Sequence, residues 1–156
     1  MGFIYRKILF TIDDSKNSER AFKRVFELQS KLDCKIVIVH SVKHYKFPLL
    51  AMPIVPSSYG SFYVSERELL EETIQEGEQL LLKVQNSFNR ENLSVETRLI
   101  KEDHPEDYIL RIVEDEKFDF VVIGAKGVHS KLKQKLIGLV AKTIVKHASC
   151  HVLIVR

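Results

Sequence analysis

The sequence predicts an α/β fold, a three-layer α/β/α arrangement around an open parallel sheet of five strands. Short apolar runs recur along the 156-residue chain, and near-continuous apolar strands are typical of parallel sheets that helices cover on both faces. Amphipathic helical patterns separate these runs, and this alternation favours a doubly wound sheet. The length suits a single domain spanning residues 1–156.

The five expected strands differ in their patterns. Four runs are almost wholly apolar and are expected to be buried, namely 7–12, 36–39, 118–123 and 152–155. The fifth run, 95–100, alternates apolar and polar residues. Such alternation predicts an edge strand or a half-exposed strand.

The first two expected helices follow the first two strands. The first begins after Asp13, Asp14 and Ser15, a run that can cap a helix, and a cap formed by one of the two aspartates is favoured over a magnesium role. The second has an apolar stripe over residues 70–88 at steps of three and four. Gly77 interrupts this stripe, which indicates a close helix contact.

The last two expected helices have clearer starts. One begins at Pro105, because proline suits the first helical position, and Asp103 or His104 is expected to cap it. The other runs from about Gly138 to His147.

The charge is unevenly distributed along the chain. The formal net charge is +3, yet no Asp or Glu follows Asp119. The acid-free tail holds seven of the 24 basic residues, namely Lys126, Lys131, Lys133, Lys135, Lys142, Lys146 and Arg156. Such a tail attracts anions, either phosphate or nucleic acid. No aromatic residue for base stacking lies among the lysines of 131–135, so nucleic acid is disfavoured.

The expected compartment is the cytoplasm. No apolar run reaches the ~18 residues needed to cross a bilayer, and residues 1–7 contain no stretch of signal-peptide length. We therefore expect no membrane partner. The two cysteines, Cys34 and Cys150, are far apart and match no metal-binding spacing.

Residues 43–63 fit neither the strand nor the helix pattern. This segment holds three of the four prolines. It is interpreted either as a long mobile loop that closes over a site or mediates a contact, or as a disordered insertion with no role.

Three segments are expected to meet at the carboxyl ends of the strands if the first strand is central. They are Thr11–Ser15, His40–Lys43 and Gly124–Gly138. Ligands of open α/β sheets bind at this end, where the strand order reverses. The third segment is acid-free and contains glycines, so its amide hydrogens and the following helix N-terminus suit a phosphate. It is neither a Walker A loop nor a Gly-x-Gly-x-x-Gly fingerprint.

Several of these motifs resemble the universal stress protein family. The stretch 7–21 resembles its first strand and acidic turn, and Pro105 with 119–127 resembles its third helix and fourth strand. The closing segment 145–155 matches closely. The resemblance covers nearly the whole chain. It implies the strand order 3-2-1-4-5, a homodimer joined through the last strand (Val152 to Val155), and ATP binding, which some members show.

The resemblance also implies a glycine motif, which this chain departs from. The family pattern is Gly-x2-Gly-x9-Gly-(Ser/Thr), and Gly124, Gly127 and Gly138 match its glycines with ten residues before the third. Leu139 stands at the hydroxyl position. A hydrogen bond from a Ser hydroxyl to a charged phosphate contributes roughly 1.5–3 kcal/mol, so its loss weakens the phosphate grip. Lys126, together with Lys131 and Lys133, could offset part of this loss.

The positions that the resemblance implies for nucleoside binding depart less from the family pattern than those for phosphate binding. Asp13 matches the family's acidic residue that contacts the nucleoside, Thr11 replaces a frequent proline, and Ser41 matches the position whose backbone pairs with adenine. The implied nucleotide-binding residues are Thr11, Ile12, Asp13, Ser41, Gly124, Ala125, Lys126, Gly127, His129, Ser130, Gly138, Leu139 and Val140. Asp13 is also a less favoured candidate for holding Mg²⁺ beside phosphates.

The leading functional hypothesis is a universal stress protein that binds ATP or AMP as a regulator in the stress response. Nothing in the sequence assembles a base, a nucleophile and an oxyanion site, so an efficient enzyme is not expected. Binding would alter affinity for a protein partner that the sequence does not identify. One alternative is a dimeric interaction module that has lost nucleotide binding. Another is a slow hydrolase that uses Asp13 and a metal.

Overall fold

The structure is a computed structural model that describes residues 5–13, 15–42, 66–125 and 137–156. Its strands are β1 (Lys7–Thr11), β2 (Lys35–Ser41), β3 (Val95–Ile100), β4 (Phe120–Gly124) and β5 (His151–Val155). Its helices are α1 (Lys16–Lys31), α2 (Glu66–Asn89), α3 (Pro105–Asp115) and α4 (Leu139–His147). All strand pairs are parallel, in the order β3-β2-β1-β4-β5. The predicted fold class and the implied strand order are confirmed.

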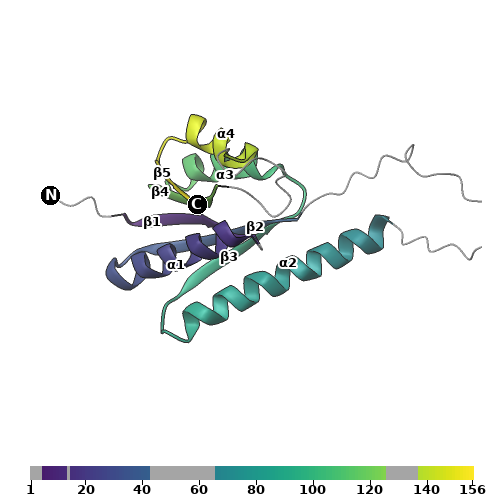
Figure 1. The fold of residues 1–156 in the computed structure, drawn as a ribbon, viewed down its shortest axis with the longest axis horizontal. Helices are drawn as coiled ribbons and strands as arrows, with labels where there is room; N and C mark the ends of the chain where they lie inside the picture. Colours follow the sequence, from purple (N-terminus) through teal and green to yellow (C-terminus); the bar gives the residue numbers. More distant parts are fainter. Residues whose placement is uncertain (1–4, 14, 43–65, 126–136) are drawn as a thin grey trace, which may run out of the picture.

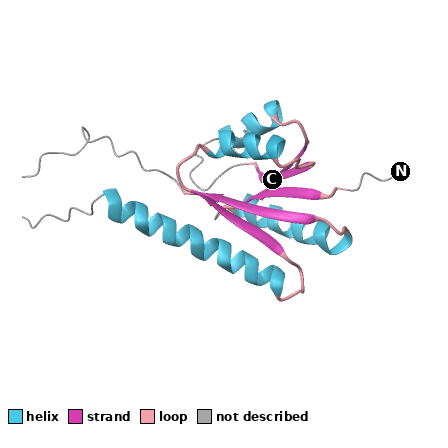
Figure 2. Ribbon diagram, turned by 180° about the vertical axis from the view of Figure 1, so that it is seen from behind, coloured by secondary structure: helices cyan, strands magenta, loops and turns pink. Residues whose placement is uncertain are grey.

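Helices cover both faces of the sheet. In Figure 1, α1 and α2 lie on one side of the strands, and α3 and α4 lie on the other. The view from behind in Figure 2 shows the same three layers. The central strand β1 serves both cores, because Ile8 and Phe10 pack toward α1 and α2 while Leu9 packs toward α3 and α4. These three side chains are fully buried.

The two edge strands are only partly buried. β3 lies at one edge with a half-exposed middle, as its alternating pattern predicts. β5 lies at the other edge, and none of its residues is fully buried. The expectation that 152–155 is buried like the central strands is therefore wrong. An edge strand has a neighbour on one side only, so its apolar sequence is left half-exposed.

The first helix is capped by Ser15 rather than by an aspartate. The Ser15 hydroxyl accepts a hydrogen bond from the Ser18 amide at 3.0 Å, which is N-cap geometry. Asp13 lies two residues earlier and accepts the Ser15 amide instead. The favoured assignment of the cap to Asp13 or Asp14 is wrong for Asp13, and Asp14 lies outside the described residues. At α3, His104 occupies the N-cap position before Pro105.

Gly77 marks a close contact of its helix, as the interrupted stripe predicts, and the partner of the helix is the sheet. A Cβ atom at Gly77 would lie 2.8 Å from Leu99 Cδ1 and 3.0 Å from His40 Cδ2. Leu99 is in β3 and His40 is in β2. The missing side chain therefore lets the backbone of α2 approach the sheet directly.

No helix among the described residues is long and apolar enough to cross a membrane. The segment 43–63, with its two interpretations, lies outside the described residues.

Candidate functional site

The carboxyl ends of β1, β2 and β4 bring together residues far apart in the sequence. The amide of Ile12 donates to the Val39 carbonyl at 2.9 Å, so the end of β1 stays beside β2. Phe10 pairs with Val122 on the other side, which places β4 against β1. The turn after β1, Ser41 at the end of β2 and Gly124 at the end of β4 therefore share one end of the sheet. This is the end at which open parallel sheets bind ligands.

Asp13 is held in a defined turn. Its Oδ1 accepts the Ser15 amide at 2.8 Å, and its own amide donates to the Ser18 hydroxyl at 2.8 Å. Ser18 is buried in the first turn of α1. These bonds fix the backbone of Asp13, and its half-buried carboxylate keeps a second oxygen beyond the one that accepts Ser15. Ile12 is buried and Thr11 is half-buried.

Gly124 lies close to the first turn of α1 and leaves little room for a side chain. A Cβ atom at this position would lie 3.2 Å from Asn17 C, from Asn17 Cβ and from Ser18 N. The contact therefore involves the backbone of the first turn of α1, which cannot move aside easily. The same glycine brings the end of β4 next to the Asp13 turn.

Hydrogen bonds join the two described ends of the segment Gly124–Gly138 to each other and to β5. The Gly138 amide donates to the Ala125 carbonyl at 2.7 Å, and the Ala125 amide donates to Val155 at 2.8 Å. The Gly138 amide is therefore used in the bond to Ala125 and is not a donor for a ligand. Gly138 has φ −64° and ψ 159°, which any residue can adopt.

The N-terminus of α4 supplies other amides. The first bond of the helix runs from the Lys142 amide to Gly138 at 2.9 Å, so the amides of Leu139, Val140 and Ala141 have no partner within the helix. The first turn of α4 contains no acidic residue, and Lys146 and His147 lie in the last turn. These amides and the helix dipole suit an anion. The Leu139 side chain is 71% exposed, so it points to solvent rather than filling the core.

Four of the predicted site residues, Lys126, Gly127, His129 and Ser130, lie outside the described residues. The structure places the others at the carboxyl end of the sheet or at the start of α4. The described part of the chain contains no cluster of three His, Cys, Asp or Glu side chains that could hold a metal ion. The less favoured role of Asp13, a single carboxylate that holds magnesium beside phosphates, stays a prediction.

His40 lies at this end of the sheet, as expected for the segment His40–Lys43, but it is not among the implied nucleotide-binding residues. Its Nδ1 lies 2.7 Å from the carbonyl oxygen of Ile12. The available signal was a polar residue directly after the buried apolar run Ile36–Val39. Its partner is 28 residues away, so the sequence does not reveal the contact.

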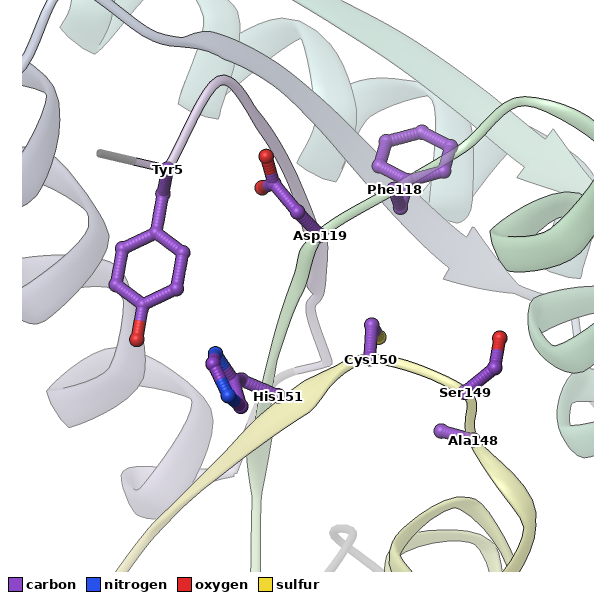
Figure 3. Close-up of a pocket in the computed structure, with 7 residues that line it drawn as sticks. All are labelled: Tyr5, Phe118, Asp119, Ala148, Ser149, Cys150 and His151. Atoms are coloured by element: carbon purple, nitrogen blue, oxygen red, sulfur yellow. The ribbon is translucent and has the colours of Figure 1, made fainter. Parts of the chain in front are cut away.

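A hollow of about 560 Å³ lies at the opposite end of the sheet (Figure 3). It is lined by Tyr5, Phe118, Asp119, Ala148, Ser149, Cys150 and His151. Both oxygens of Asp119 accept backbone amides, from Arg6 at 2.8 Å and from Lys7 at 3.2 Å. Burial, followed by the charge of Asp119, raises the pKa of the Cys150 thiol, so this thiol is a poor nucleophile. The hollow is separate from the site at the carboxyl ends.

Comparisons with known proteins point to one family. The model of the universal stress protein family matches residues 4–156. Universal stress protein MJ0531 of Methanocaldococcus jannaschii is 28% identical over 154 residues, covering 98% of this chain and 83% of the relative. The solved structure of MJ0577 from the same organism aligns with a TM-score of 0.78 at 22% identity, over 98% of this chain and 96% of the other.

One solved relative was determined with a nucleotide. A universal stress protein family protein of Arabidopsis thaliana with AMP bound aligns with a TM-score of 0.63. Its sequence identity is 21%, and the alignment covers 96% of this chain and 90% of the other. At this identity the likeness establishes a shared fold.

Proposed function

Because the chain belongs to the universal stress protein family, we propose that it is a regulatory protein of the stress response that binds an adenine nucleotide, ATP or AMP. The observation that carries this proposal is the meeting of the Asp13 turn, Ser41, Gly124 and the start of α4 at one end of the sheet. The AMP-bound relative has the same fold, which supports it.

Each part of this end has a chemical role in the proposal. The Ser41 backbone offers one donor and one acceptor to the edge of adenine, and the Asp13 carboxylate accepts from a ribose hydroxyl. The amides of Leu139 and Val140 face the phosphates with the positive end of α4. The sequence after Asp119 contributes no Asp or Glu side chain to this region, so the phosphate side of the site receives no negative charge from it.

The second candidate is a dimeric interaction module without nucleotide binding. Leu139 favours it, because a leucine side chain gives no hydrogen bond to a phosphate. The ten-residue spacing before Gly138 points the same way. In the nucleotide proposal, the amides of α4 and the lysines of the loop replace the missing hydroxyl.

Calorimetry with ATP and AMP separates the two candidates. We expect binding by the wild-type protein and at least tenfold weaker binding by Asp13→Ala, because the carboxylate is lost. Asp13→Asn keeps an oxygen that can accept the Ser15 amide, so it isolates the effect of charge from the effect of the turn. No heat at millimolar nucleotide would favour the interaction module.

Phosphate release from ATP, followed in the same proteins, tests the hydrolase alternative. We expect release to be slow and unchanged in Asp13→Ala at saturating nucleotide. Release that disappears in this variant would support a hydrolase that uses Asp13.

We also propose that two copies of the chain pair through β5. The amide of His151 donates to Asp119 and the carbonyl of Val155 accepts from Ala125. These two partners flank β4, so residues 151, 153 and 155 direct their backbone groups inward. Val152 and Ile154 then direct theirs outward from an open, apolar edge. Such an edge is a template for strand pairing.

A further inference from the structure

We propose that His40 is a positioning residue that holds the carboxyl ends of β1 and β2 open and thereby leaves the Ser41 amide available to the adenine base. The inference rests on the proposed function for its ligand. The arrangement of His40 itself stands on contacts within the protein.

The last backbone hydrogen bond between β1 and β2 is made by Ile12, one residue after the end of β1. Strand pairing ends at Thr11 opposite Val39, and the Ile12 amide adds one more bond to Val39 at 2.9 Å. In a regular parallel ladder, the Ser41 amide would next donate to the Ile12 carbonyl. Between these two described residues that bond is absent. The His40 Nδ1 occupies the carbonyl instead, at 2.7 Å.

The hydrogen bond defines the tautomer of His40. A carbonyl oxygen can only accept, so Nδ1 must carry the hydrogen. In the neutral ring, Nε2 is then the unprotonated nitrogen. His40 is therefore expected to be the Nδ1–H form, with its donor fixed on Ile12.

The ring is held from its other edge by α2. The site of a Cβ atom on Gly77 lies 3.0 Å from Cδ2 and 3.5 Å from Nε2 of His40. The backbone of α2 at Gly77 therefore lies close to the edge of the ring that faces away from Nδ1, without room for a side chain between them. A side chain at position 77 would push the ring, and the absence of one lets it sit between α2 and Ile12.

The consequence, among the residues that the structure describes, is a peptide edge at Ser41 that bonds to no neighbouring strand. The amide of the next residue, Val42, donates to Ile100 in β3 at 2.9 Å. Neighbouring residues of a strand direct their backbone groups to opposite sides, so the Ser41 amide and carbonyl point toward β1. With Ile12 bonded to His40, these two groups can pair with the acceptor and the donor on the edge of adenine.

Two measurements on the nucleotide-free wild-type protein test this arrangement. Nitrogen chemical shifts of the His40 ring should report the Nδ1–H tautomer near neutral pH, and the Nε2–H tautomer would overturn the proposal. Amide hydrogen exchange at Ser41 should be much faster than at Val39, which lies in the ladder. Equal protection of the two amides would also overturn it.

Variants then connect the arrangement to binding. His40→Phe keeps a ring but removes the donor, so the Ser41 amide can close onto Ile12. We expect slower exchange at Ser41 and AMP binding about tenfold weaker. His40→Asn retains a donor close to the position of Nδ1 and should bind AMP within about threefold of wild type.

The outcomes separate the two proposals. Unchanged AMP affinity in His40→Phe would overturn the role of His40 while leaving nucleotide binding intact. Wild-type protein that binds no adenylate would overturn the proposed function, and the tautomer and exchange data would still decide how His40 is arranged. If the substitutions acted only by destabilising the protein, both variants would have a lower unfolding midpoint and equal AMP affinities. That result would overturn the role of His40.

Discussion

Leu139 is the residue at which this chain departs most clearly from the phosphate motif of its family. Its side chain is 71% exposed at the start of α4, beside amides that have no partner within the helix. Leu139→Ser should therefore strengthen ATP binding about tenfold, because it adds a hydroxyl donor where the proposal places a phosphate. Calorimetry measures this change. Unchanged affinity would mean that the phosphates do not reach α4.

Stability should be nearly insensitive to the same substitution. An exposed side chain outside the core contributes little, and we expect the free energy of unfolding of Leu139→Ser to stay within about 0.5 kcal/mol of wild type. Leu139→Ala is the matched control, because it shortens the side chain without adding a donor.

Glu116 should make stability depend on pH. Its carboxylate accepts a hydrogen bond from Arg98 and lies 2.9 Å from Lys7 Nζ. The hydrogen bond from Arg98, and after it the one from Lys7, lower the pKa of Glu116 to about 2. The folded-state pKa is below the unfolded value of roughly 4.3, so the stabilisation is complete above that value and is lost as pH falls toward 2.

Glu116→Gln tests this dependence in urea unfolding at several pH values. The side chain is 30% exposed, so solvent screening reduces the effect, and we expect a loss of about 1–2 kcal/mol at pH 7. The difference from wild type should shrink between about pH 4.5 and pH 2. Glu27→Gln, which breaks an exposed pair with Arg24, should cost less than about 0.5 kcal/mol. A loss that is independent of pH would contradict the assignment.

At the scale of elements, α2 depends on the absence of a side chain at Gly77. Alanine is the better helix former by about 1 kcal/mol, yet its Cβ would lie 2.8 Å from Leu99 and 3.0 Å from the ring of His40. The Leu99 methyl can move, whereas the His40 ring is held by its hydrogen bond. We expect Gly77→Ala to lower the free energy of unfolding by about 1 kcal/mol.

Urea unfolding followed by circular dichroism measures this balance. Gln75→Ala, at an exposed position of the same helix, gives the background effect of adding alanine. A gain in stability for Gly77→Ala comparable with the gain in helix propensity would show that α2 has room to accept the methyl group.

The elements themselves could be predicted because their causes are local. Periodicity gave the bounds of β3, and Pro105 gave the start of α3. The details that the sequence does not reveal depend on long-range contacts. The apolar sequence of β5 does not reveal that the strand has a single neighbour, and Gly77 does not reveal that its contacts are Leu99 and His40. At the start of α1, three polar residues in a row can cap a helix, so only the geometry of the turn decides that Ser15 does.

At the scale of the whole molecule, the proposed dimer can be tested at β5. Val152→Pro removes an amide that points outward, and proline is tolerated where an edge strand faces solvent. Sedimentation should show a dimer for wild type and a monomer for Val152→Pro. Val152→Ala keeps the amide and should remain dimeric. A wild-type protein that sediments as a monomer would contradict pairing through β5.

The candidate site could be predicted only in part. The sequence placed Asp13, Ser41 and Gly124 at one end of the sheet because parallel strands align their carboxyl ends. It did not indicate that the Gly138 amide is used by Ala125, or that His40 bonds to Ile12, since both contacts arise from how distant segments pack. The family resemblance supplied the chemistry of the ligand, which the fold alone does not.

The most direct test of nucleotide binding at the carboxyl ends is a titration of labelled protein with AMP, followed by amide chemical shifts. We expect the shifted amides to cluster at Ile12, Asp13, Ser41 and Gly124 and at the start of α4. Residues of the opposite hollow, such as Asp119 and Cys150, should not shift. Shifts confined to that hollow, or no shifts at millimolar AMP, would contradict nucleotide binding at the carboxyl ends of the strands.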